Sequence, residues 1–172
     1  MKSLLILGAG GFGRMIKETA LALGYEEVLF LDDTAKDDDV IGRCCDYHLY
    51  HRDYSVAVAA FGNNKTRLFW TQKLLEEEYE VPAIVHPSAI VSPSVRLEPG
   101  CFIMQRAVVN MNTTIKMAAL INSGAVVDHD SIVEEGAHVG LGSVVKAHCV
   151  IEPGRKVEAG EVIFSTRRTI EG

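Results

Sequence analysis

Residues 121–143, INSGAVVDHDSIVEEGAHVGLGS, carry an aliphatic residue at every sixth position. Neither the 3.6-residue period of a helix nor the alternation of a strand produces this spacing, whereas a sustained short repeat is typical of solenoid folds. The pattern therefore predicts a triangular coil in which six residues form one flat side and three sides form one turn. The spacing extends without a gap in both directions, through Val85, Val91, Leu97, Ile103, Val109, Ile115, Ile121, Val127, Val133, Val139, Val145, Ile151, Val157 and Ile163.

A second column of residues supports the coil. Two positions before most of the aliphatic residues stands a small side chain, which fits the tight region near a corner while the aliphatic residue points inward. These small residues are Ala89, Cys101, Ala107, Thr113, Ala119, Ala125, Ser131, Ala137, Ser143 and Cys149.

The first half of the chain has a different pattern. Short apolar segments at residues 3–7, 27–31 and 55–61 read as strands, and helices are expected after the first of them and over residues 65–80. Alternating strands and helices predict a small parallel sheet flanked by helices. The acidic loop at residues 36–39 is expected to be solvated. We therefore predict a Rossmann-like domain over residues 1–83 and the coil over residues 84–172.

Glycines follow the first predicted strand in the pattern G-x-G-x-x-G, at Gly8, Gly10 and Gly13. A loop of this kind lets the backbone approach phosphate oxygens at a helix N-terminus. Asp32 stands about 20 residues on, where such folds place an acid against a ribose hydroxyl, and this favours a dinucleotide. About 80 residues supply only one mononucleotide-binding half, which favours a mononucleotide or a nucleotide-sugar. A tight turn without a ligand, with Asp32 and Asp33 only closing the strand, is the alternative.

A histidine between two acids follows the inward Val127. His129 is therefore expected near a corner of the coil, where it can accept a proton near neutral pH while a neighbouring carboxylate fixes its tautomer. His138 lies nine residues further, one and a half sides of the coil, so the two face different directions in one subunit and meet only across a subunit interface. His148 lies 19 residues after His129, close to one full coil above it.

The composition excludes several classes of protein. A net charge of −6 argues against a nucleic-acid-binding surface, and no apolar run approaches the length of a membrane span or precedes the first strand as a signal peptide. The four cysteines show no metal-ligand spacing, which favours free thiols in a reducing cytoplasm. The chain also lacks the H-x4-H pair with which γ-class carbonic anhydrases of a similar repeat hold zinc, so we predict no metal site.

Five stretches together resemble the bacterial sugar O- and N-acetyltransferases, which include the sialic acid O-acetyltransferase and the nucleotide-amino-sugar N-acetyltransferase of bacillosamine synthesis. The resemblance implies a left-handed parallel β-helix and a homotrimer with acetyl-CoA between neighbouring helices. It also implies a sugar or nucleotide-sugar substrate bound near the α/β domain. The stretches are LGAGGFGR (residues 7–14), FLDD (30–33), FGNNKTR (61–67), IVHPSAIVSPS (84–94) and the segment quoted first.

The resemblance also implies roles for single residues. His129 is the expected general base, with Asp130 as its acidic partner. His138 and Asn122 are expected beside the acetyl donor, and a backbone N–H near Gly142 or Ser143 is expected to stabilise the oxyanion. The positions on the nucleotide-binding loops are Gly8, Gly10, Gly11, Asp32, Asp33 and Asn63.

Two departures from the family pattern leave alternatives open. Phe12 stands where members commonly have histidine, and charged Arg155 and Glu161 in the small-residue column read as a terminal cap that shortens the coil. An acetyltransferase of surface-glycan synthesis is therefore expected first. A non-catalytic trimeric scaffold or nucleotide-sugar-binding protein with a truncated coenzyme groove is the second hypothesis. A nucleotide-dependent oxidoreductase, suggested by the glycine pattern alone, is the third.

Overall fold

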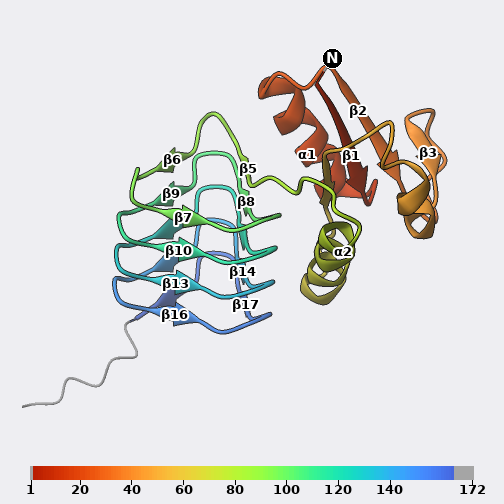
Figure 1. The fold of residues 1–172 in the computed structure, drawn as a ribbon. Coiled ribbons are helices and arrows are strands. Elements are labelled where there is room, and N and C mark those ends of the chain that lie inside the picture. Colours follow the sequence, from red (N-terminus) through yellow and green to blue (C-terminus); the bar gives the residue numbers. More distant parts are fainter. Residues whose placement is uncertain (1, 165–172) are drawn as a thin grey trace, which may run out of the picture.

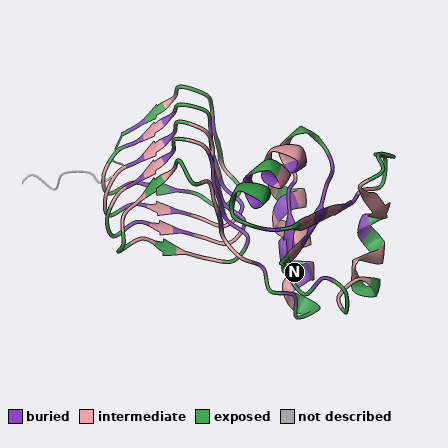
Figure 2. Ribbon diagram, turned by 90° about the horizontal axis from the view of Figure 1, so that it is seen from above, coloured by how far each residue is buried: buried purple, intermediate pink, exposed green. Residues whose placement is uncertain are grey.

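The computed structural model describes residues 2–164. An α/β unit and a coil of short stacked strands lie side by side, with the N-terminus in the α/β unit (Figure 1). Figure 2 shows the central strands of the α/β unit as buried, whereas many corners of the coil are exposed. No helix in this part of the chain is long and apolar enough to cross a bilayer. The fold is a small Rossmann-like unit followed by a left-handed parallel β-helix, as predicted.

The α/β unit is built on a four-stranded parallel sheet with the strand order β3-β2-β1-β4. Its central strand β1 is apolar because both of its faces are covered, and Leu4 to Leu7 are fully buried. The strands are β1 (Ser3–Leu7), β2 (Glu27–Leu31), β3 (Val40–Gly42) and β4 (Ala57–Ala59), and a 3-10 helix η1 (Cys44–Leu49) follows β3.

The second of the two helices is shorter than the sequence predicted. Helix α1 (Gly11–Ala22) buries Ile16 and Ala20, and Leu23 lies beyond its last turn and is exposed. Helix α2 (Asn64–Glu76) is capped by Asn63 and ends four residues earlier than predicted, because Glu78 adopts a left-handed backbone with φ of 62°. Strand β3 and helix η1 were not predicted.

The loop before β3 is also different from the prediction of a solvated acidic segment. Arg14 of α1 donates two hydrogen bonds to Asp39, at 2.8 and 2.7 Å, and a third to Asp37. Lys17 donates to Asp39 as well, at 2.7 Å. Partial burial raises the pKa of Asp39, but the hydrogen bonds from Arg14 and Lys17 outweigh it and lower the pKa. The acidic loop is therefore fastened to α1.

Three parallel sheets form the faces of the coil, and each strand pairs with the strand 18 residues further on, as in Thr114 with Ile132. One sheet holds β5 (Ile84–Val85), β8 (Phe102–Ile103), β11 (Leu120–Ile121), β14 (His138–Val139) and β17 (Lys156–Val157). A second holds β6 (Ile90–Val91), β9 (Val108–Val109), β12 (Val126–Val127), β15 (Val144–Val145) and β18 (Val162–Ile163). The third holds β7 (Arg96–Leu97), β10 (Thr114–Ile115), β13 (Ile132–Val133) and β16 (Val150–Ile151).

The inward column forms the core of the coil, as predicted. Its aliphatic residues from Ile103 to Val157 are fully buried, and so are the small residues from Cys101 to Ser143. The corners also repeat a backbone conformation, which was not predicted from the sequence. The second residue of each two-residue turn is left-handed from Gly100 to Gly160, and five of these positions hold a residue other than glycine, namely Arg106, Asn112, Ala118, Asp130 and His148.

Arg67 joins the α/β unit to the coil. This residue of α2 is fully buried, and burial lowers the pKa of its guanidinium to about 10. Its Nε donates to the carbonyl of Ala118 at 2.7 Å, and its terminal nitrogens donate to the carbonyls of Gly136 and Phe61, both at 3.0 Å. A buried charge needs such partners, so these bonds fix α2 against one corner of the coil.

Candidate active site

A histidine–carboxylate pair occupies the corner between β12 and β13. The Nδ1 atom of His129 lies 2.7 Å from Oδ2 of Asp130, and the other carboxylate oxygen of Asp130 accepts a hydrogen bond from Asn112 at 3.2 Å. Both side chains of the pair are 38% exposed, so a substrate can reach them. With Nδ1–H donating to Asp130, the free lone pair of the imidazole is on Nε2.

Asp128 supports the pair from the other side. Its Oδ1 accepts hydrogen bonds from the backbone N–H of His129 at 2.8 Å and from Asn110 at 2.9 Å, and the latter is the main reason for its lowered pKa. The hydrogen bond with Asp130 raises the pKa of His129 and lowers that of Asp130. The histidine is thus a stronger base than an isolated imidazole, with its ring orientation fixed.

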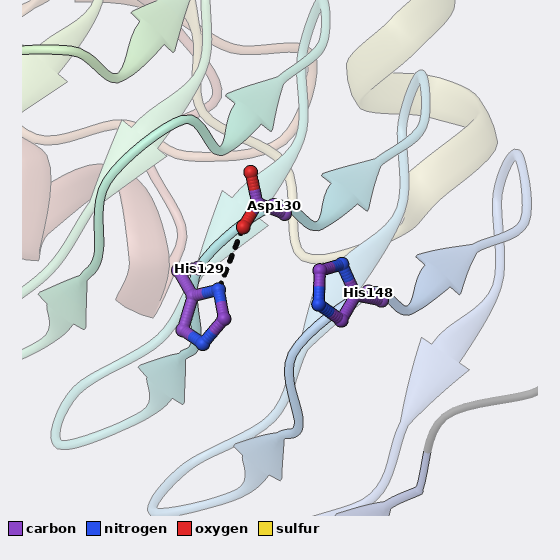
Figure 3. A group of neighbouring side chains, drawn as sticks. All are labelled: His129, Asp130 and His148. Carbon is purple, nitrogen blue, oxygen red and sulfur yellow. Dashed lines mark hydrogen bonds and ion pairs between the residues drawn. The ribbon is translucent and has the colours of Figure 1, made fainter.

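His148 lies next to His129, on the corner one coil further along. The two ring centroids are 5.3 Å apart and the rings are nearly perpendicular, and the backbone N–H of His148 donates to the carbonyl of His129 at 3.1 Å. Figure 3 shows the three side chains His129, Asp130 and His148 grouped at this corner. The 19-residue spacing correctly predicted this position of His148.

His138 and Asn122 form a separate polar pair on the sheet that contains β11 and β14. The Nε2 of His138 lies 3.0 Å from the amide nitrogen of Asn122, which identifies Nε2 as the acceptor and Nδ1 as the protonated atom. Burial, and after it the charge of Arg67, lowers the pKa of His138 to about 4, so the ring is neutral near pH 7. Its Nδ1 is buried without a hydrogen-bond partner in the described structure.

This polar pair lines a cavity of about 190 Å³ on a different side of the coil from His129. The other lining residues include Gly140, Leu141 and Lys156. Since His138 is on a strand of one sheet and His129 is in the corner that follows another, one chain does not bring the two histidines together.

The expected oxyanion donors are not available in this arrangement. The backbone N–H of Gly142 donates to the carbonyl of Ser123 at 3.0 Å, and that of Ser143 donates to the carbonyl of Gly140 at 3.2 Å. The Ser143 hydroxyl is also buried and donates to Gly140. These two amides therefore do not fill the oxyanion role, because both hold the coil together, and a donor near them stays a prediction.

The glycine loop combines structural and accessible positions. Gly8 is left-handed with φ of 99°, and a Cβ on Gly13 would come within 1.9 Å of the Gly8 carbonyl oxygen, so both positions require glycine for the fold. Gly10 and Gly11, in contrast, face open space within 4 Å. They stand at the N-terminus of α1, where backbone amides are available to an anion.

Asp32 has a clear structural role. Its Oδ2 accepts a hydrogen bond from the backbone N–H of Ala9 at 2.8 Å, and its Oδ1 accepts bonds from Thr34 and Ala35. Asp32 therefore ties the glycine loop to the end of β2. Asp33 accepts a bond from the Cys44 amide at 3.1 Å. Both acids line a cavity of about 350 Å³ together with Thr34, Lys36, Val40, Gly42 and Arg43.

A further cavity of about 390 Å³ opens where the N-terminus of α2 meets the coil. Asn63 lines it but also accepts a hydrogen bond from the Thr66 amide at 3.0 Å, so its side chain caps the helix. Two cationic residues that the sequence analysis missed, Lys65 and Lys156, line it as well. The 18-residue repeat could have predicted the position of Lys156, because Lys156 follows His138 by 18 residues and pairs with it on the neighbouring strand.

Comparison with known proteins shows which proteins this chain resembles. Residues 3–74 match the family model described as the PglD N-terminal domain. The acetyltransferase domain of PglB from Neisseria gonorrhoeae is similar over 98% of this chain and 94% of that domain, with 28% identity and a TM-score of 0.75. The chain is therefore similar to sugar acetyltransferases over nearly its whole length. It is accordingly an enzyme of the acyltransferase class.

Two further structures extend the comparison for this acetyltransferase. PerB from Caulobacter crescentus, solved with CoA and GDP-perosamine, is 28% identical over 96% of this chain and 90% of that one, with a TM-score of 0.80. WeeI from Acinetobacter baumannii, at 17% identity and a TM-score of 0.72, supports the fold alone. Because these matches span at least 90% of each relative, the expectation of a markedly shortened coil is not supported.

Proposed function

We propose that this acetyltransferase transfers the acetyl group of acetyl-CoA to an amine or hydroxyl of a nucleotide-linked sugar in surface-glycan synthesis. The hydrogen-bonded His129–Asp130 pair, accessible at a corner of the coil, is the observation that carries the proposal. The relatives named above support the choice of ligands: a structure of the gonococcal PglB domain contains acetyl coenzyme A, and the PerB structure contains CoA and GDP-perosamine.

In the proposed reaction His129 is the general base. Its Nε2 takes the proton from the acceptor amine or hydroxyl as that atom attacks the thioester carbonyl, while Nδ1–H stays bonded to Asp130. The tetrahedral intermediate then collapses, the C–S bond breaks and the proton passes to the departing CoA sulfur. No covalent bond to the enzyme forms, so catalysis depends on proton transfer and on positioning.

Two groups of residues are proposed to hold the substrates. The open backbone at Gly10 and Gly11, with the cavity beside Asp32 and Asp33, is suited to a nucleotide phosphate and ribose. Asn122 and His138 line the cavity proposed for the acetyl donor.

A homotrimer completes the proposed site. His129 and His138 lie on different sides of one chain, so a groove containing both requires the corner of one copy to face a sheet of the next. The spacing of the cysteines, which matches no metal-ligand motif, is consistent with a cytoplasmic location, where acetyl-CoA is available. Light scattering on the purified protein tests the trimer, and a monomeric enzyme with full activity would refute it.

The decisive experiment is thiol release from acetyl-CoA with a panel of UDP- and GDP-linked amino sugars. We expect turnover with at least one member of the panel and its loss in His129→Ala. An unchanged rate in His129→Ala would contradict the role of the base. A wild-type protein that binds these nucleotide-sugars but never releases thiol would instead favour a binding protein.

A further inference from the structure

One corner of the coil gathers two imidazoles and a carboxylate. One potential ligand atom from each of His129, Asp130 and His148 lies within 4.8 Å of the other two. The three residues come from two successive coils, and their side chains stand together in Figure 3. The sequence predicted no metal site because the chain lacks the H-x4-H pair, although the 18-residue turn brings His148 beside His129.

The backbone under this group is fixed by the coil. Asp130 and His148 occupy equivalent left-handed positions with φ of 55° and 60°, and the His148 amide donates to the His129 carbonyl. The inward residues on the same two coils, Val127 and Val145, are fully buried. The Cα positions therefore cannot drift apart, and only the side-chain torsions need to change when a ligand binds.

We propose that His129, Asp130 and His148 form a binding site for a divalent transition-metal ion such as Zn²⁺. Two imidazole nitrogens and one carboxylate oxygen are a common ligand set for zinc, with bond lengths of about 2.0–2.2 Å, and solvent supplies the remaining position. To bind the ion, Asp130 turns its Oδ2 from the Nδ1 of His129 to the metal. Asp128 lies beside His129 and adds a further negative charge.

Such an ion has a direct consequence for the proposed reaction. A His129 nitrogen that ligates a metal cannot accept a proton, and Asp130 can no longer orient the ring. Zinc at this corner therefore inhibits acetyl transfer instead of assisting it. This consequence rests on the proposed function, whereas the binding site itself does not.

The binding test uses the full chain without a histidine tag, stripped of metal and titrated with ZnCl₂ in a calorimeter. We expect one saturable site that weakens by about tenfold or more in His148→Asn, since even loss of an outer hydrogen-bond partner costs a metal site about 10–100-fold. Asparagine suits the left-handed backbone at this position, so the variant should fold. Asp130→Asn, which also keeps that backbone, should weaken binding similarly.

His48→Asn is the matched control, because His48 is an exposed histidine outside the group. It should bind zinc like the wild type, and the exposed Cys45 contributes equally to all of these proteins. Equal zinc affinity in the wild type, His148→Asn and Asp130→Asn would overturn the metal site.

A second readout separates this proposal from the function on which it draws. The fold-inhibition by zinc is measured for each protein against its own metal-free rate. We expect strong inhibition of the wild type and of His48→Asn, and at least tenfold weaker inhibition of His148→Asn. Calorimetric binding without acetyl transfer to any sugar would remove the proposed function and leave the site, whereas acetyl transfer with unaltered zinc inhibition in His148→Asn would remove the site alone.

Discussion

The Nδ1 of His129 is 2.7 Å from the carboxylate of Asp130, the next residue in the chain, and a left-handed backbone at Asp130 makes this contact between neighbours possible. Aspartate and asparagine tolerate this backbone better than most residues. The corner of the coil thus supplies both the exposure of the histidine and its orientation.

Replacing the two members of this pair should have graded effects on catalysis. We expect His129→Gln to lower kcat by about 10²–10⁴-fold, the usual contribution of a general base. Asp130→Asn keeps the backbone and the size of the side chain but loses the charge, so kcat should fall by a smaller factor. Thiol release measures both, and circular dichroism checks the fold. A kcat for Asp130→Asn below that of His129→Gln would contradict the assigned roles.

Removal of Arg67 should destabilise the whole chain. Arg67→Met leaves the carbonyls of Ala118, Gly136 and Phe61 without their donor in a buried region, and each such group costs about 1–3 kcal/mol. We expect the free energy of unfolding to fall by about 3 kcal/mol or more in a denaturant titration. Lys73→Met removes an exposed cation from the same helix, where Lys73 pairs with Glu76, and should change little. Equal stability of the two variants would show that Arg67 does not hold the units together.

The coil was predictable because every turn repeats one environment. Every sixth residue points into the same apolar core, so Val127, Val145 and their equivalents are all aliphatic. The six-residue period can therefore be recognised without information about long-range contacts. The position of His148 beside His129 follows from the same arithmetic. The left-handed corner positions were missed because Asn112, Asp130 and His148 interrupt the glycines that would have marked them.

Contacts in the α/β unit depend on loop paths that the sequence does not encode locally. Asp39 pairs with Arg14 across 25 positions, and nothing in either segment distinguishes such a pair from two solvated charges. Arg67 likewise has the sequence context of an exposed helical residue, and only the docking of α2 on the coil buries it. The roles of Asp32 and Asn63 in the candidate site were also only partly predictable. Both side chains accept hydrogen bonds that stabilise the fold, and the family resemblance did not indicate these bonds.

Two substitutions in the glycine loop should have different effects, one on the stability of the fold and the other on ligand binding. Gly13→Ala places a Cβ 1.9 Å from the Gly8 carbonyl oxygen, so overpacking should destabilise the protein by about 1–3 kcal/mol or more. Gly11→Ala meets nothing within 4 Å and should leave the free energy of unfolding within about 0.5 kcal/mol of the wild type. If the loop binds phosphate, however, its methyl group should obstruct the ligand. Calorimetry with a nucleotide-sugar checks this, and unchanged affinity in Gly11→Ala would argue against a phosphate site there.

Asp32 should make the fold sensitive to acid. Partial burial raises its pKa, but the hydrogen bonds from Ala35, Ala9 and Thr34 outweigh that effect and lower the pKa to about 2. Because the folded pKa is below the ordinary value of 3.8, the ionised carboxylate stabilises the fold fully above about pH 4, and this contribution disappears as the pH falls towards 2. Solvent screening reduces its size, so we expect about 1 kcal/mol near neutral pH.

Asp32→Asn tests this contribution through the pH dependence of unfolding. Relative to the wild type, the variant should be less stable at pH 7, and the difference should shrink as the pH is lowered from about 4 towards 2, because protonation removes the same charge from the wild type. Denaturant titrations across this range measure the difference. Asp33→Asn leaves the four hydrogen bonds to Asp32 in place and is the matched control. A stability difference between the wild type and Asp32→Asn that stays constant down to pH 2 would mean that packing around Asp32, and not its charge, fastens the glycine loop to β2.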